Sequence, residues 1–189
     1  MGTASEDRCA LVGRFQPMHL GHVYLVNAAL KRYRDIIIVV GSAQYSHTIR
    51  NPFTAGERIE MIYRTLKGMG ISNSLIIPIE DIHRHSLWVE HVLTFLPRIK
   101  GVYANEPITQ RLFSEHGIRV HPVRLYKRGS YCASEIRQRI ADGRKWKHLV
   151  PRDVAQVIEE IDGARRIKEI ARTDSDFAED RYRVNAGTE

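Results

Sequence analysis

Cysteines are scarce in this sequence, and long apolar runs are missing. Cys9 and Cys132 are the only cysteines among 189 residues, and a chain of this length buries a sufficient core without disulfides. We therefore expect reduced thiols and a cytoplasmic location, with a single bridge between the two cysteines as the alternative. The polar residues 1–8 lead into an apolar run too short to cross a bilayer, so the sequence predicts neither a signal peptide nor a membrane segment.

Zinc-ligand spacings and nucleic-acid signatures are also missing. No cysteine lies at the spacing of a zinc ligand, and we expect no metal site made by the protein alone. The formal charge of +7 attracts nucleic acids, acidic lipids or small phosphorylated molecules. Runs of lysine and arginine, which coat a duplex, do not occur. We rank ordinary surface charge first, attraction of a phosphorylated substrate second and nucleic acid third.

Short apolar runs alternate with helical patterns along the chain. Five β-branched residues in a row occupy 36–40, a pattern typical of a strand buried on both faces. The predicted strands are 9–13, 36–41, 75–78, 102–104 and 118–123. The predicted helices lie near 21–33, 55–68, 87–96 and 107–116. This alternation predicts an α/β fold with a doubly wound parallel sheet, whose ligands bind at the carboxyl ends of the strands.

The carboxyl-terminal part of the sequence is helical. Helices are predicted at 133–141 and 151–172, and we expect them to pack on a single domain that spans 1–172. Residues 173–189 are polar with few apolar anchors, so we expect a flexible tail, with a docking arm as the alternative. Upstream, Thr54 and Glu57 form a predicted capping box that sets the start of the second helix.

The most informative segment, 13–22, joins the first predicted strand to the first predicted helix. It reads Gly-Arg-Phe-Gln-Pro-Met-His-Leu-Gly-His. Gly21 allows a phosphate close to the backbone, and the amides at the helix start favour negative charge. His19 and His22 can both donate to phosphate oxygens, and Arg14 supplies a cation in the same loop. The alternative is that both histidines merely begin an amphipathic helix.

Together with the block 41–58, this segment resembles the archaeal-type nicotinamide-nucleotide adenylyltransferases of the HxGH nucleotidyltransferase superfamily. The block contains Gly-Ser-Ala-Gln at 41–44 and Arg-Asn-Pro-Phe-Thr-Ala-Gly-Glu-Arg at 50–58. The resemblance covers roughly residues 9–170 and implies a Rossmann-like nucleotidyltransferase fold. It also implies that His19 and His22 contact the ATP phosphates and that Arg14 lies beside the phosphates of both substrates.

A second family signature resembles residues 132–137, which read Cys-Ala-Ser-Glu-Ile-Arg. Ser134 retains a hydroxyl that can donate to a phosphate, and the fork of Arg137 suits two phosphate oxygens. The family pattern usually reads Ser-Gly-Thr or Ser-Ser-Thr, so Cys132 and Ala133 depart from it. The alternative is that Ser134 only caps a helix and Arg137 lies on the surface.

The resemblance implies two further sets of site residues. Trp88 and Asp81 match positions that line the nicotinamide pocket, since a pyridinium ring stacks on an indole and a carboxylate attracts its charge. A tryptophan of the core is the alternative, and His85 and Glu106 stand where related sequences often have asparagine. The residues predicted to bind ATP or phosphate are Gly13, Phe15, Gly21, Ser42, Arg50 and Ser134.

The implied reaction joins nicotinamide mononucleotide to ATP, giving NAD and pyrophosphate by direct in-line attack. It needs no general base, and Mg²⁺ is expected to travel with the ATP phosphates. The expected catalytic residues are His19, His22, Arg14 and Arg137. The alternatives are another acceptor (nicotinic acid mononucleotide, FMN or phosphopantetheine) or a non-catalytic nucleic-acid-binding module. The family resemblance also suggests a homo-oligomer such as a hexamer.

Overall fold

A five-stranded parallel sheet forms the centre of the structure, a computed structural model that describes residues 7–121 and 131–173. The strands are β1 (Arg8–Gly13), β2 (Asp35–Val40), β3 (Ser74–Pro78), β4 (Gly101–Ala104) and β5 (Arg119–His121). They lie in the order β3-β2-β1-β4-β5, so the order reverses between β1 and β4. All five predicted strands are confirmed, although 122–123 of the last one lie outside the described residues, as does 174–189 of the predicted tail.

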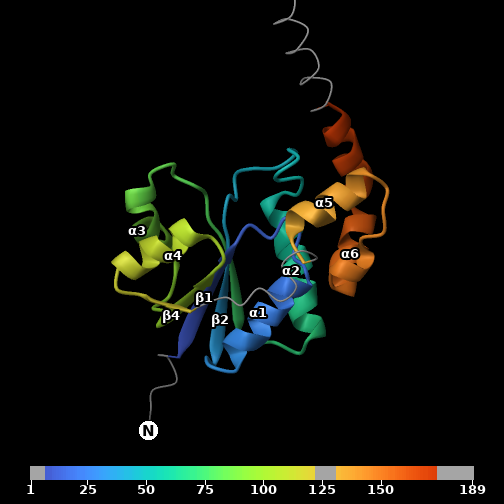
Figure 1. The fold of residues 1–189 in the computed structure, drawn as a ribbon. Helices are drawn as coiled ribbons and strands as arrows, with labels where there is room; N and C mark the ends of the chain where they lie inside the picture. The colour runs from blue at the N-terminus through green and yellow to red at the C-terminus, as the bar shows by residue number, and fades with distance from the viewer. Residues whose placement is uncertain (1–6, 122–130, 174–189) are drawn as a thin grey trace, which may run out of the picture.

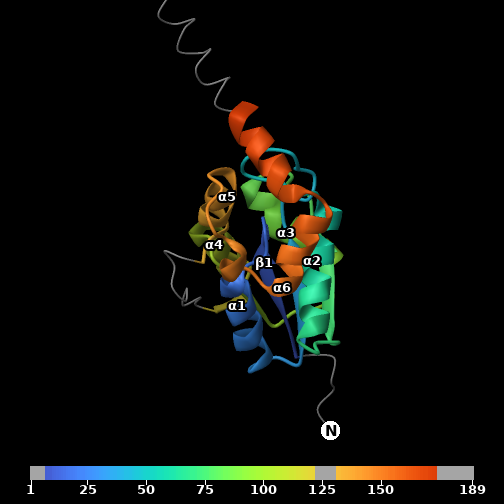
Figure 2. The ribbon, with the colours of Figure 1, turned by 90° about the vertical axis from the view of Figure 1, so that its right-hand side faces the viewer.

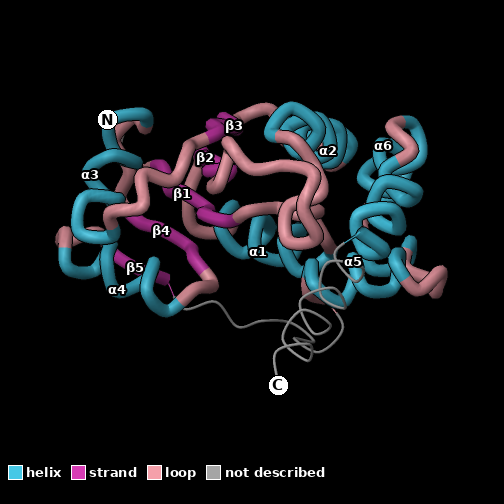
Figure 3. Tube along the Cα trace, turned by 90° about the horizontal axis from the view of Figure 1, so that it is seen from above, coloured by secondary structure: helices cyan, strands magenta, loops and turns pink. Residues whose placement is uncertain are grey.

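Helices cover both faces of the sheet (Figure 1). They are α1 (Leu20–Leu30), α2 (Ala55–Gly68), α3 (His85–Phe95), α4 (Pro107–Glu115), α5 (Ala133–Ala141) and α6 (Arg152–Glu160), with a short 3₁₀ helix, η1 (Lys147–Leu149). α1 and α2 cover one face, α3 and α4 cover the other, and α5 and α6 lie beyond α1 and α2 (Figure 3). The doubly wound parallel sheet with a helical carboxyl-terminal segment is therefore confirmed.

The β-branched run of β2 explains why both faces need helices. Ile36, Ile38 and Val40 belong to the core beneath α1 and α2. Ile37 and Val39 point the other way, into the core beneath α3 and α4. All five are at most 1% exposed. A strand alternates its side chains between faces, so this sequence is stable only in the middle of a two-sided sheet.

One prediction about the carboxyl-terminal part is wrong. The segment expected to be a single helix from 151 to 172 is broken, because α6 ends at Glu160 and a second helix runs from 163 to 173. Asp162 takes a φ of 51° at the break. A Cβ on Gly163 would lie 2.9 Å from Cε1 of Phe53, so a glycine is needed for this close approach. Figure 2 shows the chain changing direction there.

The break allows the last helix to reach the start of α2. The capping box of α2 is confirmed, with Thr54 N donating to Glu57 Oε2 at 2.9 Å and Glu57 N donating to Thr54 Oγ1 at 3.2 Å. Arg166 donates to both carboxylate oxygens of Glu57, each at 2.8 Å. Burial alone raises the pKa of Glu57, but hydrogen bonds from Arg166 and Thr54 outweigh it and lower that pKa.

The described residues show the state of both cysteines and the character of the helices. Cys9 and Cys132 are both free thiols. Cys9 is fully buried, and burial followed by the charge of Asp7 raises the pKa of its thiol to about 12. Within 7–121 and 131–173, the helices are too short or too polar to cross a membrane.

Replacing Arg166 with methionine tests the contact between the last helix and α2. We expect Arg166→Met to lower the free energy of unfolding by about 1–3 kcal/mol at pH 7, since it removes charge-assisted hydrogen bonds. Because folding lowers the pKa of Glu57 from 4.5, we expect the full loss of stability above pH 4.5. The loss becomes smaller as the pH falls through the lowered pKa of Glu57. Urea unfolding at pH 7 and pH 3 measures both, with Arg172→Met as control. An equal loss at the two pH values contradicts the assignment.

Candidate active site

The candidate site lies at the carboxyl ends of the strands, where the loops after β1, β2 and β3 rise above the sheet (Figure 1). Each of these loops holds a non-glycine residue with a positive φ: Phe15 at 50°, Ser42 at 52° and His83 at 54°. Such conformations cost about 1–3 kcal/mol each and persist only where surrounding contacts impose them. The contacts of these loops therefore identify the part of the molecule that is built for a ligand.

The two histidines of the His-x-Gly-His motif stack at the start of α1. His19 is its N-cap residue, and the ring centroids of His19 and His22 lie 3.7 Å apart. The backbone N–H of His19 donates to Nδ1 of His22 at 3.2 Å, so a neutral His22 carries its proton on Nε2. Nδ1 of His19 is buried and has no hydrogen-bond partner within the described ranges. The pair thus offers ring nitrogens that the protein itself does not satisfy.

Both imidazoles are neutral near pH 7. Burial lowers the pKa of His19 to about 4. Burial and then the neighbouring His19 hold the pKa of His22 well below its ordinary value. A neutral ring donates one N–H, and a phosphate that approaches it stabilises the protonated form. Anion binding at this pair is therefore coupled to proton uptake.

Three arginines, Arg14, Arg50 and Arg137, lie near this loop. Burial, then Arg14 and to a lesser degree Arg50, lower the pKa of Arg137 to about 10, so it stays charged at pH 7. Neither Arg14 nor Arg50 joins an ion pair with any described residue. Clustered cations without carboxylate partners favour an anionic ligand.

The predicted phosphate fork of Arg137 is largely used inside the protein. Its Nε donates to the carbonyl of Ile49 and its Nη1 to the carbonyl of Gln16, both at 2.8 Å. The side chain is 9% exposed. Arg137 is therefore not the surface residue of the alternative interpretation. It fastens α5 to two loops of the site and leaves Nη2 as the donor for a ligand.

Sequence reasoning assigned no role to Arg58, which is the largest fully buried side chain of the site. It is 0% exposed. Its guanidinium donates to four backbone carbonyls, those of Thr54, Arg14, Gly41 and Ser42, at 2.8 to 3.2 Å. Burial, then Arg14, lower the pKa of Arg58 to about 10. It lies one helical turn before the buried Met61 and Ile62, so an arginine on the apolar face of α2 was the available signal.

The side-chain amide of Gln16 joins the loop after β1 to the segment before α2. Nε2 of Gln16 donates to the carbonyl of Phe53 at 2.8 Å, and the N–H of Phe53 donates to Oε1 at 3.0 Å. Gln16 is 1% exposed. This pair of bonds has the pattern of a backbone rung between two strands, so it fixes how the two segments lie side by side.

The start of α5 lies against the start of α1. A Cβ on Gly21 would lie 3.0 Å from ring atoms of His19 and 3.4 Å from Cβ of Tyr131. Cys132 is the N-cap of α5 and supplies no side-chain hydrogen bond to the helix amides, and its Sγ lies 3.4 Å from Oγ of Ser134. Ser134 is exposed. The two helix starts therefore approach each other, and the N-cap side chain of α5 leaves the helix amides uncapped.

The two residues predicted for the nicotinamide pocket have different surroundings. Oγ of Ser42 donates to Oδ2 of Asp81 at 2.7 Å, which joins the loops after β2 and β3. Trp88 is half-buried and packs edge-to-face on Phe113, with centroids 5.9 Å apart. The indole is thus supported by the core under α3 and α4, in line with the core alternative for one of its sides.

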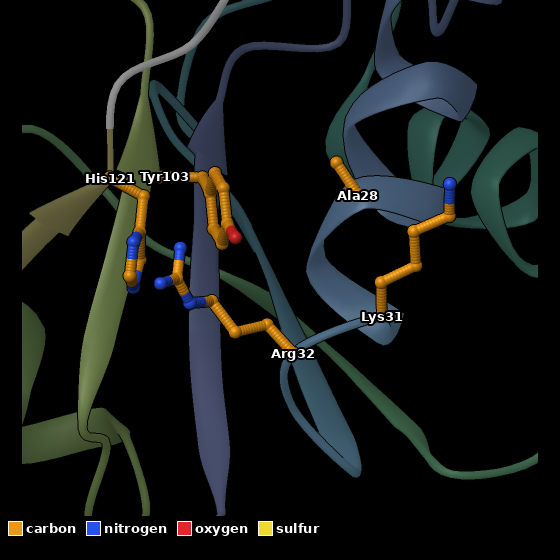
Figure 4. Close-up of a pocket in the computed structure, with 5 residues that line it drawn as sticks. All are labelled: Ala28, Lys31, Arg32, Tyr103 and His121. Atoms are coloured by element: carbon orange, nitrogen blue, oxygen red, sulfur yellow. The ribbon is translucent and has the colours of Figure 1, made fainter.

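A cavity of about 370 Å³ lies apart from this site. It is lined by Ala28, Lys31, Arg32, Tyr103 and His121, and none of these is a predicted site residue (Figure 4). No group of three or more histidine, cysteine, aspartate or glutamate side chains in the described ranges is placed to hold a metal ion.

Comparison with known proteins identifies relatives of the whole chain. A family described as cytidylyltransferase-like matches residues 10–139. The nicotinamide-nucleotide adenylyltransferase of Thermoplasma volcanium is 45% identical over 176 residues, which cover 93% of this chain and 99% of that protein. The nicotinamide-nucleotide adenylyltransferase of Archaeoglobus fulgidus is also 45% identical, over 172 residues and 99% of its length.

A solved structure confirms the fold. It is a bifunctional NMN adenylyltransferase/ADP ribose pyrophosphatase from Francisella tularensis in complex with AMP and a manganese ion. The TM-score is 0.74 at 24% sequence identity. The match covers 97% of this chain but only 57% of that one, so it concerns one part of a longer protein.

Adding a methyl group to Gly21 tests the stacked histidines. We expect Gly21→Ala to displace the His19 ring, since the added Cβ would lie 3.0 Å from the ring atoms. Binding of inorganic triphosphate should then weaken roughly 10- to 100-fold, which corresponds to the loss of one or two hydrogen bonds to an anion. Calorimetry measures the affinity. Gly56→Ala is the matched control, because the nearest atom to its Cβ lies 4.0 Å away. Equal affinity in both variants contradicts this geometry.

The lowered pKa of His19 predicts proton uptake on anion binding. At pH 5.5 the free ring is neutral, since its pKa is about 4, and a bound phosphate raises that pKa. Titration of triphosphate in two buffers of different ionisation enthalpy measures the uptake, which we expect to fall in His19→Asn. Without ligand, the same shift lowers stability as pH falls from 6.5 to 4, because the unfolded ring binds the proton first. Equal uptake in the two proteins contradicts the role of His19.

Proposed function

Because the chain belongs to the cytidylyltransferase-like family, and within it to the nicotinamide-nucleotide adenylyltransferases, we propose that it transfers the adenylyl group of ATP to nicotinamide mononucleotide. An oxygen of the mononucleotide 5′-phosphate forms a bond to the α-phosphorus. The bond from that phosphorus to the β-phosphate oxygen breaks, and pyrophosphate leaves with the electron pair. The products are NAD and pyrophosphate.

The observation that carries this proposal is a cradle for a polyanion, formed by imidazole and guanidinium side chains of the described residues. Two neutral imidazoles begin α1, and Arg14, Arg50 and Arg137 surround them without carboxylate partners. The mononucleotide phosphate is already ionised near neutral pH and needs no general base. Positioning and charge stabilisation are then sufficient for the reaction.

We assign the residues of the cradle as follows. His19 and His22 stabilise charge on the triphosphate, and Arg14 and Arg50 align the phosphates of the two substrates. Arg137, through Nη2, and Ser134, beside the uncapped amides of α5, hold the departing pyrophosphate. Gly13, Phe15, Gly21 and Ser42 shape the backbone beside the ATP phosphates.

A divalent cation enters with the nucleotide. We propose that the phosphates hold this ion. Mg²⁺ usually binds in this way, with several waters and few protein ligands. The Francisella protein was crystallised with manganese and AMP, so Mn²⁺ is a second candidate for the ion.

We also propose a location, a domain organisation and an oligomeric state for this enzyme. We place the enzyme in the cytoplasm, where its free thiols stay reduced. Residues 1–172 are proposed to act as one domain. A homo-oligomer is also proposed. Among the described residues, the large apolar side chains that are exposed are Tyr24, Tyr63, Leu75, Leu87, Phe95 and Ile108. Light scattering measures that state directly.

Turnover is the direct test of the function. With ATP, Mg²⁺ and nicotinamide mononucleotide, we expect NAD and pyrophosphate in equal amounts. His19→Ala should lower kcat by about 10² to 10³, the usual effect of removing one donor aimed at developing charge. His148→Ala, an exposed histidine near α6, is the matched control. Triphosphate binding without NAD formation in the unmodified protein contradicts the proposal.

A further inference from the structure

The loops after β2 and β3 continue the hydrogen-bonding pattern of the sheet, and the side chain of Gln44 forms the last pair of hydrogen bonds. Beyond the strands, Ile79 N donates to the carbonyl of Val40 at 2.9 Å, and Ala43 N donates to the carbonyl of Ile79 at 3.0 Å. At the next step Nε2 of Gln44 donates to the carbonyl of Asp81 at 2.9 Å, and Asp81 N donates to Oε1 of Gln44 at 3.0 Å. The amide of Gln44 thus fixes the backbone of Asp81 on both sides.

The carboxylate of Asp81 is oriented by the same two loops. Its Oδ2 accepts the hydroxyl proton of Ser42 at 2.7 Å. The carbonyl of Ser42 in turn accepts from Arg58, which also holds the carbonyl of Arg14 in the phosphate loop. No ion pair joins Asp81 to a described cation, and the donors of Arg58 are directed at carbonyls. The charges of Asp81 and Arg58 act on each other, but Asp81 forms no ion pair with a described residue, and Oδ1 is its open acceptor.

We propose that Gln44 is a positioning residue that sets acceptor selectivity, by holding the Asp81 carboxylate where it favours a nicotinamide ring over a nicotinic acid ring. This inference rests on the proposed function. Both rings are pyridinium cations in the mononucleotides, but nicotinamide adds an N–H donor where nicotinic acid adds a carboxylate. Asp81 accepts from the first and repels the second. One hydrogen bond and one charge repulsion therefore select between acceptors of nearly the same shape.

Gln44 affects acceptor selectivity only through its two hydrogen bonds to the backbone of Asp81. Gln44 itself is exposed, so its removal leaves the core intact. Without the amide, Asp81 is held by the single bond from Ser42, and the positive φ of His83 two residues later is less constrained. The backbone of Ser42 is still held by Arg58. The carboxylate then occupies several positions, and selectivity falls while the ATP cradle on β1 and α1 stays in place.

The test compares kcat/KM for nicotinamide mononucleotide and nicotinic acid mononucleotide in four proteins: wild type, Gln44→Met, Asp81→Asn and Gln156→Ala. Gln44→Met keeps the length of the side chain and removes both hydrogen bonds. Gln156 bonds only to Glu160 on α6 and is the matched glutamine control. We expect the ratio to fall about tenfold or more in the first two variants, a fraction of what a polar pocket can discriminate. The KM for ATP and the melting temperature should stay close to wild type.

Other results overturn the inference, and one of them also overturns the proposed function. An unchanged ratio in Gln44→Met, or a wild type that prefers nicotinic acid mononucleotide, overturns the inference while the proposed function stands. An equal loss for both acceptors with a raised KM for ATP shows a merely structural role for Gln44 and overturns it as well. A folded wild type that makes neither dinucleotide removes the proposed function, and the inference with it.

Discussion

The site depends on one buried charge. Removing a guanidinium from water costs several kcal/mol unless its donors are satisfied. Four of the five N–H groups of Arg58 donate to carbonyls, which come from the ends of β1 and β2 and from the start of α2. Those carbonyls converge only if the loops adopt their strained conformations. The cost of leaving Arg58 unsatisfied therefore maintains the strain at Phe15 and Ser42.

The other contacts of the site repeat this arrangement with different side chains. Gln16, Gln44 and Arg137 each bond to backbone groups of a distant segment. Because they bind the backbone, the side chains of the same loops remain available for ligands. The resulting cradle has an excess of positive charge, which is unfavourable in the free protein and is relieved when a polyanion binds. Ligand binding should therefore stabilise the fold by more than its contact area suggests.

The sequence predicted what depends on local patterns. The strands, the capping box of Thr54 and Glu57 and the position of His19 and His22 at a helix start follow from periodicity and short motifs. The break at Asp162 was missed although the pair Asp162-Gly163 is typical of turns. Apart from the local contact of Arg58 with Thr54, the carbonyl contacts of Arg58 and Arg137 were missed because they join segments that are 16 to 121 residues apart. Only the three-dimensional fold brings these segments together.

The capping of α2 has a consequence for where a nucleotide can settle. α1 and α2 both begin at the carboxyl edge of the sheet, and each helix start carries partial positive charge. α2 has Glu57 in its first turn, locked by Arg166, whereas α1 has no acidic residue there. The capping box already uses two N–H groups at the start of α2, since Glu57 accepts from Thr54 N and Thr54 Oγ1 accepts from Glu57 N. The chain thus closes the start of α2 to a second anion and leaves the start of α1 open to a triphosphate.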